Sequence, residues 1–297
     1  MSILEDIRSL KIQGASAVAL AAVDFISYKL DRFKGSSKRE LYKELSKARK
    51  DLIATRPTEP FMRNALSYIF AAEGKNFDEY FMSLKNKAQR AKQNLRYSND
   101  LISEIGFHKI RKGSVIYTHC HSSTVVHILK KARDHGVRFT VNNTETRPLY
   151  QGRKTAKELS RLGIPVRHFI DSAARIAIKQ SDLVLLGCDA ITTEGKVINK
   201  IGSEMIAEIA YRYDVPVYSC THSWKFDPQT VFGMEEPIEN RSRNEVWPNA
   251  PKKIEVYNPA FEMIRAGLIT GLITEIGIYR SEILVEEMKK RNSWIMQ

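Results

Sequence analysis

The chain has few cysteines, no long apolar run and no dinucleotide-binding fingerprint. Its three cysteines, Cys120, Cys188 and Cys220, lack metal-type spacing, which argues against a disulfide framework and a zinc site and favours a reducing cytoplasm. No run of about 18 apolar residues is present, so we expect no transmembrane helix. The first residues lack the basic start and apolar core of a secretory signal. No GxGxxG motif follows a predicted strand, which leaves a nicotinamide cofactor without support.

Acidic residues are outnumbered. The 297 residues include 47 Lys and Arg against 34 Asp and Glu, a net charge of +13. This balance suits anionic partners such as sugar phosphates, nucleic acid or an acidic protein. The basic residues are interleaved with acids along the chain, and their short clusters are more typical of solvated helix faces than of a nucleic-acid site. Charge alone therefore does not select a function.

The sequence pattern changes near residue 110. Before it, apolar residues recur at helical spacing; the expected helices are 15–26, 37–55, 64–72 and a longer one from 77 to 110 that ends near Gly106. After it, short β-branched runs alternate with helical stretches; the expected strands are 115–117, 139–141, 166–170, 183–186 and 215–218, and the expected helices are 124–134, 155–162, 173–179 and 204–213.

This alternation predicts a parallel sheet with right-handed crossovers. We therefore expect an α/β protein in which a helical N-terminal domain, residues 1–110, precedes a Rossmann-like parallel-sheet domain, residues 111–297. The apolar run 268–273 is a candidate for an oligomer contact or for a core strand or helix.

Two residues with acid–base chemistry follow predicted strands. Cys120 comes directly after the run 114–117, and Asp189 comes directly after 182–186. Ligands bind at the carboxyl ends of parallel strands in an open α/β sheet, so a thiol and a carboxylate there indicate paired acid–base catalysis. The structural alternative is a buried small hydrophobe and a helix-capping aspartate.

Polar residues beside Cys120 are typical of an anion site. Ser122 and Ser123 open the next predicted helix, whose free backbone N–H groups and hydroxyls can bind phosphate or simply cap the helix. His119 and His121 flank the thiol and, if protonated, would lower its pKa; either one could instead point away from it.

Further candidate phosphate contacts follow other strands. Arg147 follows the second strand, and its guanidinium matches phosphate oxygens, although it could instead pair with Glu145. Asn199 and Lys200 supply donors between two glycines after Asp189. In the helical half, Gly14 can begin a helix that faces an anion and Arg56 can reach the sheet domain; the structural alternative for each is a turn or a cap.

Together these loops resemble the family that unites the alpha, beta and delta subunits of initiation factor 2B with methylthioribose-1-phosphate isomerase and archaeal ribose-1,5-bisphosphate isomerase. The resemblance covers nearly the whole chain and is most specific from Gly187-Cys188-Asp189 to Asn199-Lys200-Ile201-Gly202. The other matching stretches are Thr118-His119-Cys120, Thr144-Glu145-Thr146-Arg147-Pro148, Asp171-Ser172-Ala173-Ala174, Trp224-Lys225-Phe226 and Asn258-Pro259-Ala260-Phe261.

The resemblance implies an isomerase that needs no cofactor or metal and converts an aldose 1-phosphate to a ketose 1-phosphate, most similar to the archaeal branch acting on ribose 1,5-bisphosphate. Cys120 and Asp189 match the catalytic pair of the isomerases. Phosphorylation of O1 blocks ordinary ring opening, so Asp189 would protonate the ring oxygen and Cys120 would move hydrogen between C2 and C1. Asn199 and Lys200 would hold the sugar hydroxyls and a phosphate.

The resemblance also places Gln13, Gly14 and Ala15 where the isomerases carry Arg-Gly-Ala-Gly, a phosphate contact. The arginine is replaced here by Gln13, as in the initiation factor subunits, and His121 stands where isomerases usually have Asn. Cys188 replaces the alanine of Gly-Ala-Asp and adds a second thiol.

Two other functions remain open from the sequence. One is a non-catalytic regulatory subunit of an initiation factor 2B-like assembly, which would contact initiation factor two; the other is a phosphate-metabolite binding protein with a vestigial site. The Cys120–Asp189 pair favours catalysis, and Gln13 favours the regulatory subunit. The resemblance further implies a homo-oligomer, a dimer or hexamer, and an AMP-type effector.

Overall fold

The computed structural model describes residues 3–9, 11–12, 14–232, 238 and 240–296. Contacts within the chain divide it into two compact units. The first contains Met1–Ser98, Trp224–Pro228 and Glu287–Gln297, and the second contains Asn99–Ser223 and Gln229–Glu286. The expected domain division at residue 110 stays a prediction, because a compact unit of contacts need not be a domain that folds independently.

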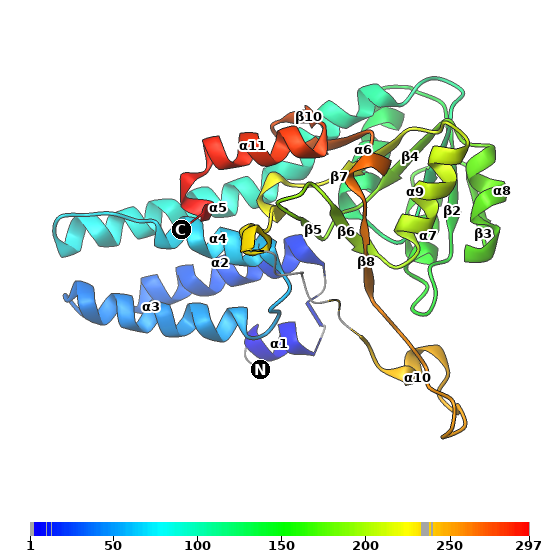
Figure 1. The fold of residues 1–297 in the computed structure, drawn as a ribbon. Coiled ribbons are helices and arrows are strands. Elements are labelled where there is room, and N and C mark those ends of the chain that lie inside the picture. Colours follow the sequence, from blue (N-terminus) through cyan, green and yellow to red (C-terminus); the bar gives the residue numbers. More distant parts are fainter. Residues whose placement is uncertain (1–2, 10, 13, 233–237, 239, 297) are drawn as a thin grey trace. The chain divides into compact units, whose positions relative to one another are not determined.

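The described part of the first unit is helical. Small apolar residues allow α2 to pack closely against α4, with Val18, Ala19 and Ala22 buried. Ser37 caps α3 by accepting a hydrogen bond from the Glu40 N–H at 3.4 Å. The helices that begin in this unit are α1 (Ile3–Arg8), α2 (Ala15–Arg32), α3 (Lys38–Ile53), α4 (Pro60–Phe70) and α5 (Phe77–Gly106), as Figure 1 shows.

A short segment from far along the sequence, Trp224–Pro228, belongs to the first unit. Asn64 of α4 donates from Nδ2 to the carbonyl oxygens of Trp224 and Phe226, at 2.7 and 2.6 Å. Arg63 forms an ion pair with the buried carboxylate of Asp227 at 2.8 Å. Two side-chain hydrogen bonds to buried backbone carbonyls, together with a buried ion pair, fix this segment to α4.

The second unit contains a seven-stranded sheet in the order β10-β9-β7-β4-β1-β2-β3. Its strands are parallel except for β10, which pairs antiparallel with β9. The strands are β1 (Val115–Thr118), β2 (Thr140–Thr144), β3 (Val166–Phe169), β4 (Leu183–Leu186), β7 (Val217–Cys220), β9 (Gly271–Thr274) and β10 (Gly277–Tyr279) (Figure 1).

The chain first runs outward from β1 through β2 to β3 and then returns to β4 on the other side of β1. Right-handed crossovers in opposite directions place helices on both faces of such a sheet. In agreement, α6 contacts α7, and α8 contacts α9. These helices are α6 (Ser123–Asp134), α7 (Gln151–Arg161), α8 (Ala174–Lys179) and α9 (Ser203–Arg212). Ile116, Ile128, Leu129, Val141 and Leu185 are among the residues of the buried core between sheet and helices.

A second, three-stranded sheet lies beyond the carboxyl end of β4. It has the order β5-β6-β8 and is antiparallel throughout; its strands are β5 (Ala190–Ile191), β6 (Val197–Lys200) and β8 (Phe261–Ile264). This sheet was not anticipated from the sequence, because its strands are short and two of them are separated only by a turn. Asn199 and Lys200 therefore lie on a strand rather than in a loop.

The predicted fold class is confirmed. The long helix was expected to end near Gly106, and α5 does end there. The five predicted strands correspond to β1, β2, β3, β4 and β7; the bounds of β4 agree, and the ends of the others differ by at most three residues. The apolar run 268–273 contains the first residues of β9, whose four residues are buried. Of its two alternatives, a core strand is the correct one for Gly271–Ile273.

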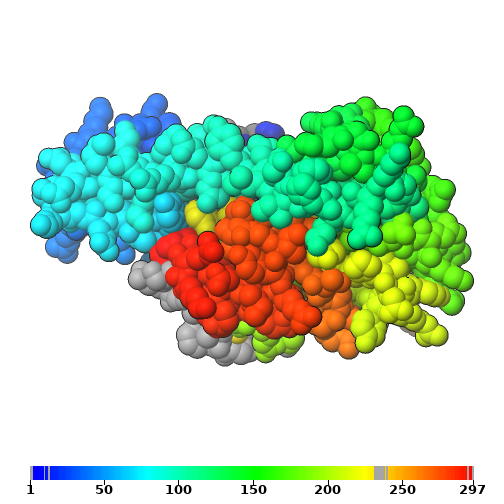
Figure 2. Space-filling view, turned by 90° about the horizontal axis from the view of Figure 1, so that it is seen from above, coloured from blue at the N-terminus to red at the C-terminus, as the bar shows by residue number. Residues whose placement is uncertain are grey.

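An arm of the second unit carries exposed aromatic residues. Residues 240–260 leave the sheets, form the short helix α10 (Arg243–Val246) and return to β8 (Figure 1). Within this arm Trp247 is 47% exposed and Tyr257 71% exposed. Figure 2 shows residues of α11 (Ser281–Arg291) in red on the surface. Exposed apolar side chains of this kind are typical of contact surfaces.

Substitution of Gly152 tests how closely α7 packs on the carboxyl end of β2. A Cβ atom at this position would lie 1.7 Å from the carbonyl oxygen of Thr144, whereas a Cβ atom at Gly267 would have no neighbour within 4 Å. We expect Gly152→Ala to lower the free energy of unfolding by about 1–3 kcal/mol, the cost of overpacking. Gly267→Ala is the matched control and should leave the urea midpoint unchanged. Equal midpoints for the two variants would contradict this packing.

Candidate functional site

The carboxyl ends of β1 and β4 carry the two residues with acid–base chemistry. These strands pair in parallel, with Thr118 opposite Leu185, so Cys120 and Asp189 leave the sheet at the same edge. The chain reverses direction across this pair, because β2 and β3 lie beyond β1 while β7 and β9 lie beyond β4. Such a reversal opens a crevice in which α/β proteins bind ligands. The sequence prediction that both residues belong to one edge agrees with this topology.

The backbone of Cys120 is held in a left-handed conformation. Its φ is 63°, which is uncommon for a residue with a side chain. The Cys120 N–H donates to Oγ1 of Thr146 at 2.9 Å, and the Cys120 carbonyl accepts from Oγ1 of Thr155 at 2.8 Å. Hydrogen bonds at both backbone groups of Cys120 therefore stabilise the turn that presents the thiol.

A second strained residue supports the first. Thr146 is buried with φ at 62°, an outlier for a β-branched residue. Asp171, which follows β3, accepts hydrogen bonds from the backbone N–H groups of Thr146 at 2.8 Å and of Arg147 at 2.7 Å. One carboxylate thus fixes the loop after β2, and that loop in turn fixes Cys120.

Burial raises the pKa of the Cys120 thiol to about 11. Lys200 and the His121 N–H oppose this shift, because both stabilise a thiolate, whereas Asp189 and Asp171 add to it by charge repulsion. The thiol is therefore protonated at neutral pH. Its electrostatic interactions with Asp189 and with Lys200 indicate that each of these two side chains lies near the thiol.

Of the two alternatives left open for His119 and His121, the contacts of both rings argue against a protonated imidazole that lowers the pKa of the thiol. His119 is buried, with Nδ1 2.7 Å from Oγ1 of Thr144 and Nε2 2.9 Å from the carbonyl oxygen of Ile201. His121 has Nδ1 3.0 Å from Oγ1 of Thr155. Burial lowers the pKa of both imidazoles, which keeps them neutral and unable to stabilise a thiolate by charge.

Gly187, the last residue before Cys188-Asp189, lies between two other candidate residues. A Cβ atom at Gly187 would lie 3.0 Å from Cβ of Ser122 and 3.5 Å from Oδ1 of Asn199. Ser122 caps α6 by accepting from the Val125 N–H at 3.4 Å, and Ser123 is exposed in the first turn. Asn199 is buried and donates from Nδ2 to Oγ of Ser203 at 2.9 Å. The structure therefore brings Ser122, Gly187 and Asn199 together beside the acid–base pair.

The backbone N–H groups at the N-terminus of α9 already bind a carboxylate of the protein itself. Glu262 of β8 accepts a hydrogen bond from the Glu204 N–H at 2.7 Å. Burial raises the pKa of Glu262, while the N–H groups of residues 202–204 oppose the shift. An anion near the start of α9 would therefore bind to side chains such as Lys200, whose ammonium lies 4.6 Å from the ring centre of Phe261.

Arg147 is exposed at the mouth of the loop after β2. Its guanidinium donates to the hydroxyl of Tyr150 at 2.5 Å and to the carbonyl of Val246, in the arm, at 3.3 Å. Glu145 pairs with Arg153 at 2.8 Å and not with Arg147, so the structural alternative considered for Arg147 is wrong. Arg147 remains a candidate phosphate contact.

The candidate residues of the N-terminal half belong to the first unit. Gly14, with φ at 86°, precedes α2, and Ala15 is buried in its first turn. The guanidinium of Arg56 lies 3.9 Å from the carboxylate of Glu59. Gln13 lies outside the described residues. Substrate contacts of these four residues stay predictions.

Several residues that organise the site were not predicted as part of it. Thr146 and Thr155 hold the backbone of Cys120 by hydrogen bonds, and Asp171 holds the backbone of Thr146. Of these three residues, Asp171 is the one that its position directly after a predicted strand could have indicated. Cys188, the second thiol near the site, is buried and donates to the carbonyl of Ala190 at 3.2 Å. It therefore has a structural contact in the small sheet.

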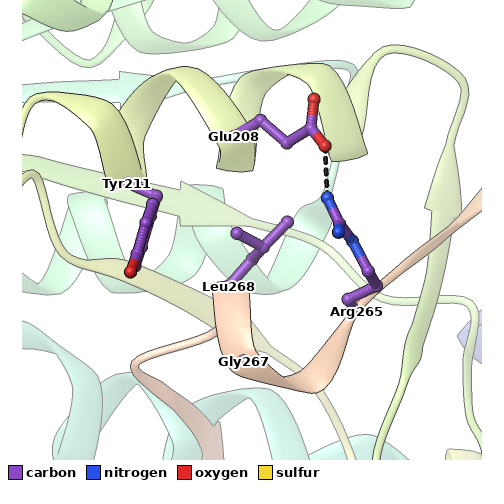
Figure 3. A pocket seen from close by; sticks show the side chains of 5 residues that line it. All are labelled: Glu208, Tyr211, Arg265, Gly267 and Leu268. Atoms are coloured by element: carbon purple, nitrogen blue, oxygen red, sulfur yellow. Dashed lines mark hydrogen bonds and ion pairs between the residues drawn. The ribbon is translucent and has the colours of Figure 1, made fainter.

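One hollow in the second unit is remote from these residues. Figure 3 shows it lined by Glu208, Tyr211, Arg265, Gly267 and Leu268, with an ion pair between Arg265 and Glu208. Tyr211 is in the last turn of α9 and Gly267 precedes β9, so this hollow lies at the amino ends of the strands. It does not contain the acid–base pair.

The described residues contain no group of three or more His, Cys, Asp or Glu placed to hold a metal ion. Within the same part of the chain, no helix is long and apolar enough to cross a membrane. The arrangement offers a neutral thiol, a carboxylate and an ammonium group at one edge of a sheet. Such a set can transfer protons to and from a bound anionic ligand.

The buried imidazole of His119 makes stability depend on pH. Its folded-state pKa lies below the ordinary 6.5, so below that pH the unfolded chain binds a proton that the folded protein does not. We expect His119 to contribute a loss of up to about 1.4 kcal/mol in the free energy of unfolding per pH unit as the pH falls below 6.5. Urea titrations between pH 7.5 and 5.5 measure this loss.

His119→Gln should have a shallower pH dependence than the wild type, because it lacks the titrating group. His127→Gln, which removes an exposed imidazole, is the control and should keep the wild-type slope. Parallel curves for the wild type and His119→Gln would show that His119 does not titrate in this way.

Comparison with known proteins identifies the family. Residues 11–281 match the model of the Initiation factor 2 subunit family. The chain is 37% identical to the ribose 1,5-bisphosphate isomerase of Pyrococcus furiosus, covering 98% of this chain and 94% of that protein. It is 33% identical to the methylthioribose-1-phosphate isomerase of Pelotomaculum thermopropionicum, covering 94% and 82%. The structure of a translation initiation factor eIF-2B from Pyrococcus horikoshii OT3 superposes with a TM-score of 0.80 at 24% identity, covering 94% and 95%. The chain therefore belongs to the initiation factor 2 subunit family.

Proposed function

We propose that the protein is an aldose–ketose isomerase that converts ribose 1,5-bisphosphate to ribulose 1,5-bisphosphate. The observation that carries the proposal is the placement of Cys120 and Asp189 at adjacent strand ends across the reversal of the sheet, where the charge of Lys200 acts on the thiol. The similarity to several archaeal proteins of that name supports the choice of substrate.

The thiol and the carboxylate act as a pair that shares one proton. At neutral pH the proton is on Cys120, whose pKa is about 11. Transfer to Asp189 gives a thiolate and a carboxylic acid without changing the net charge of the site. Lys200, which stabilises the thiolate, favours this reactive form. The pair then contains both an acid for the ring oxygen and a base for carbon.

The reaction follows from this form. Asp189 donates its proton to the ring oxygen as the bond between that oxygen and C1 breaks, and the Cys120 thiolate removes the proton from C2. The resulting enol phosphate becomes the ketone when its C2 hydroxyl gives a proton to Asp189 and Cys120 delivers a proton to C1. C2 becomes a ketone, C1 a methylene, and both residues regain their starting protonation.

The phosphates and hydroxyls of the substrate require cationic and polar partners. Asn199, Lys200, Ser122 and Ser123 lie beside the pair or at the start of α6, and Arg147 lies in the loop that holds Cys120. We include Gln13, Gly14, Ala15 and Arg56 of the first unit as further substrate contacts, on the strength of the sequence resemblance.

We also propose a homo-oligomer, a dimer or hexamer, in the cytoplasm, with an AMP-type effector. The exposed Trp247 and Tyr257 of the arm support the oligomer, because large aromatic side chains gather in interfaces. The small number of cysteines, three in 297 residues, supports a reducing compartment. The effector rests on the family resemblance alone.

Turnover of ribose 1,5-bisphosphate by the purified protein tests the proposal directly. We expect Cys120→Ser and Asp189→Asn each to reduce kcat by about 10²-fold or more, since each removes a group needed for proton transfer. Cys188→Ser is the control: it removes a thiol one residue from Asp189 but keeps the donor to Ala190. Circular dichroism and urea midpoints should match the wild type in all three.

Turnover that survives both substitutions would contradict the roles of Cys120 and Asp189. No turnover by the wild type, with sugar phosphate or AMP still bound, would instead favour the regulatory subunit of an initiation factor 2B-like assembly. Binding of initiation factor two would then be the next measurement.

A further inference from the structure

A buried imidazole connects the loop after β1 with the loop before α9. The side chain of His119 is 3% exposed and lies between the ends of β1, β2 and β6. Its Nδ1 is 2.7 Å from Oγ1 of Thr144, and its Nε2 is 2.9 Å from the carbonyl oxygen of Ile201. Both ring nitrogens are thus engaged, and neither has access to solvent.

The partners fix the tautomer. The carbonyl oxygen of Ile201 can only accept, so Nε2 carries the hydrogen and Nδ1 is the acceptor. The hydroxyl of Thr144 then donates to Nδ1 and accepts from the hydroxyl of Tyr117, which lies 3.2 Å away. The result is a series of hydrogen bonds, each donated in the same direction, from Tyr117 through Thr144 and His119 to Ile201. Burial lowers the pKa of His119 and so favours the neutral ring that this series requires.

Contacts at both ring nitrogens of His119 reach the candidate site. On the Nε2 side, Ile201 stands between Lys200 and Gly202, and a Cβ atom at Gly202 would lie 3.2 Å from Nε2 of His119. On the Nδ1 side, Thr146 places Oγ1 3.4 Å from Nδ1 and accepts from the Cys120 N–H. The imidazole therefore packs directly against the loop that carries Lys200 while its own backbone continues into Cys120.

We propose that His119 is a positioning residue: its Nε2–H bond to Ile201 holds Lys200 at a fixed place relative to Cys120. This inference rests on the proposed isomerase function for its kinetic consequence. The residue does not exchange protons with substrate, because both nitrogens are committed to protein groups. Other contacts of the loop, such as the bond from the Ile201 N–H to the carbonyl of Ala260, remain when His119 is changed.

Two substitutions separate the two nitrogens. The amide of His119→Gln reaches the position of Nε2 and can donate to Ile201, whereas the shorter amide of His119→Asn reaches only the position of Nδ1 and can bind Thr144. We expect His119→Asn to raise the KM for ribose 1,5-bisphosphate about tenfold, the effect of one hydrogen bond that orients a charged contact. His119→Gln should stay within about twofold of the wild type.

Amide hydrogen exchange of the peptide that contains residues 200–203 gives a second readout that needs no substrate. It should accelerate in His119→Asn and remain at the wild-type rate in His119→Gln. Because this measurement is independent of turnover, it decides the inference even if the wild type proves inactive and the proposed function fails. If both histidine variants are unstable, Thr144→Val, which removes the donor to Nδ1 and leaves the Nε2–H bond to Ile201, should keep the wild-type exchange rate in the same peptide, and acceleration there would contradict the role given to Nε2.

Equal exchange rates in His119→Asn and the wild type would overturn the inference. So would KM values that rise equally in the Asn and Gln variants and follow their urea midpoints, since that result describes a general loss of stability. An active wild type with unchanged KM in His119→Asn would leave the isomerase intact and remove the positioning role.

Discussion

The parallel pairing of β1 with β4 is the constraint on which the site depends. These strands are far apart in the sequence, and their register, Thr118 opposite Leu185, sets which residues emerge together at the carboxyl edge. A shift of one residue would turn every side chain of the strand to the other face of the sheet. Both strands are buried almost throughout, so close packing of side chains on the two faces of the sheet fixes the register. Core packing thus positions a thiol and a carboxylate that contribute little to the core themselves.

Local strain beside these strands is compensated by hydrogen bonds from neighbouring loops. Cys120 and Thr146 both adopt left-handed backbone conformations, which cost about 1–3 kcal/mol each in a residue with a side chain. Asp171, Thr155 and His119 supply the opposing interactions, and none of them needs to touch a ligand to do so. The carboxyl edge of the sheet therefore has two sets of polar residues. One set can contact a substrate, and the other holds the first set in position by hydrogen bonds.

The sequence predicted the larger elements and the edge at which chemistry lies, because those depend on period and on strand order. It identified Cys120, Asp189, Asn199 and Lys200 as neighbours through the polar residues that follow strands. It could not show that Glu262 occupies the N-terminus of α9, since β8 is some 60 residues away in the chain. Nor could it show that His119 turns toward Ile201, because the direction of a side chain depends on tertiary contacts. For that reason the sequence left open whether a flanking histidine acts on the thiol.

The central claim is that Cys120 and Asp189 form one electrostatically coupled pair. The most direct test is titration of the Cys120 thiol by ultraviolet absorbance of the thiolate. The absorbance of Cys120→Ser is subtracted, which removes the contribution of the two other cysteines. Asp189 adds to the raised pKa of the thiol, which is about 11 in the wild type. The account therefore predicts a lower pKa of Cys120 in Asp189→Asn than in the wild type. An unchanged pKa in that variant would contradict the pairing on which the proposed chemistry rests.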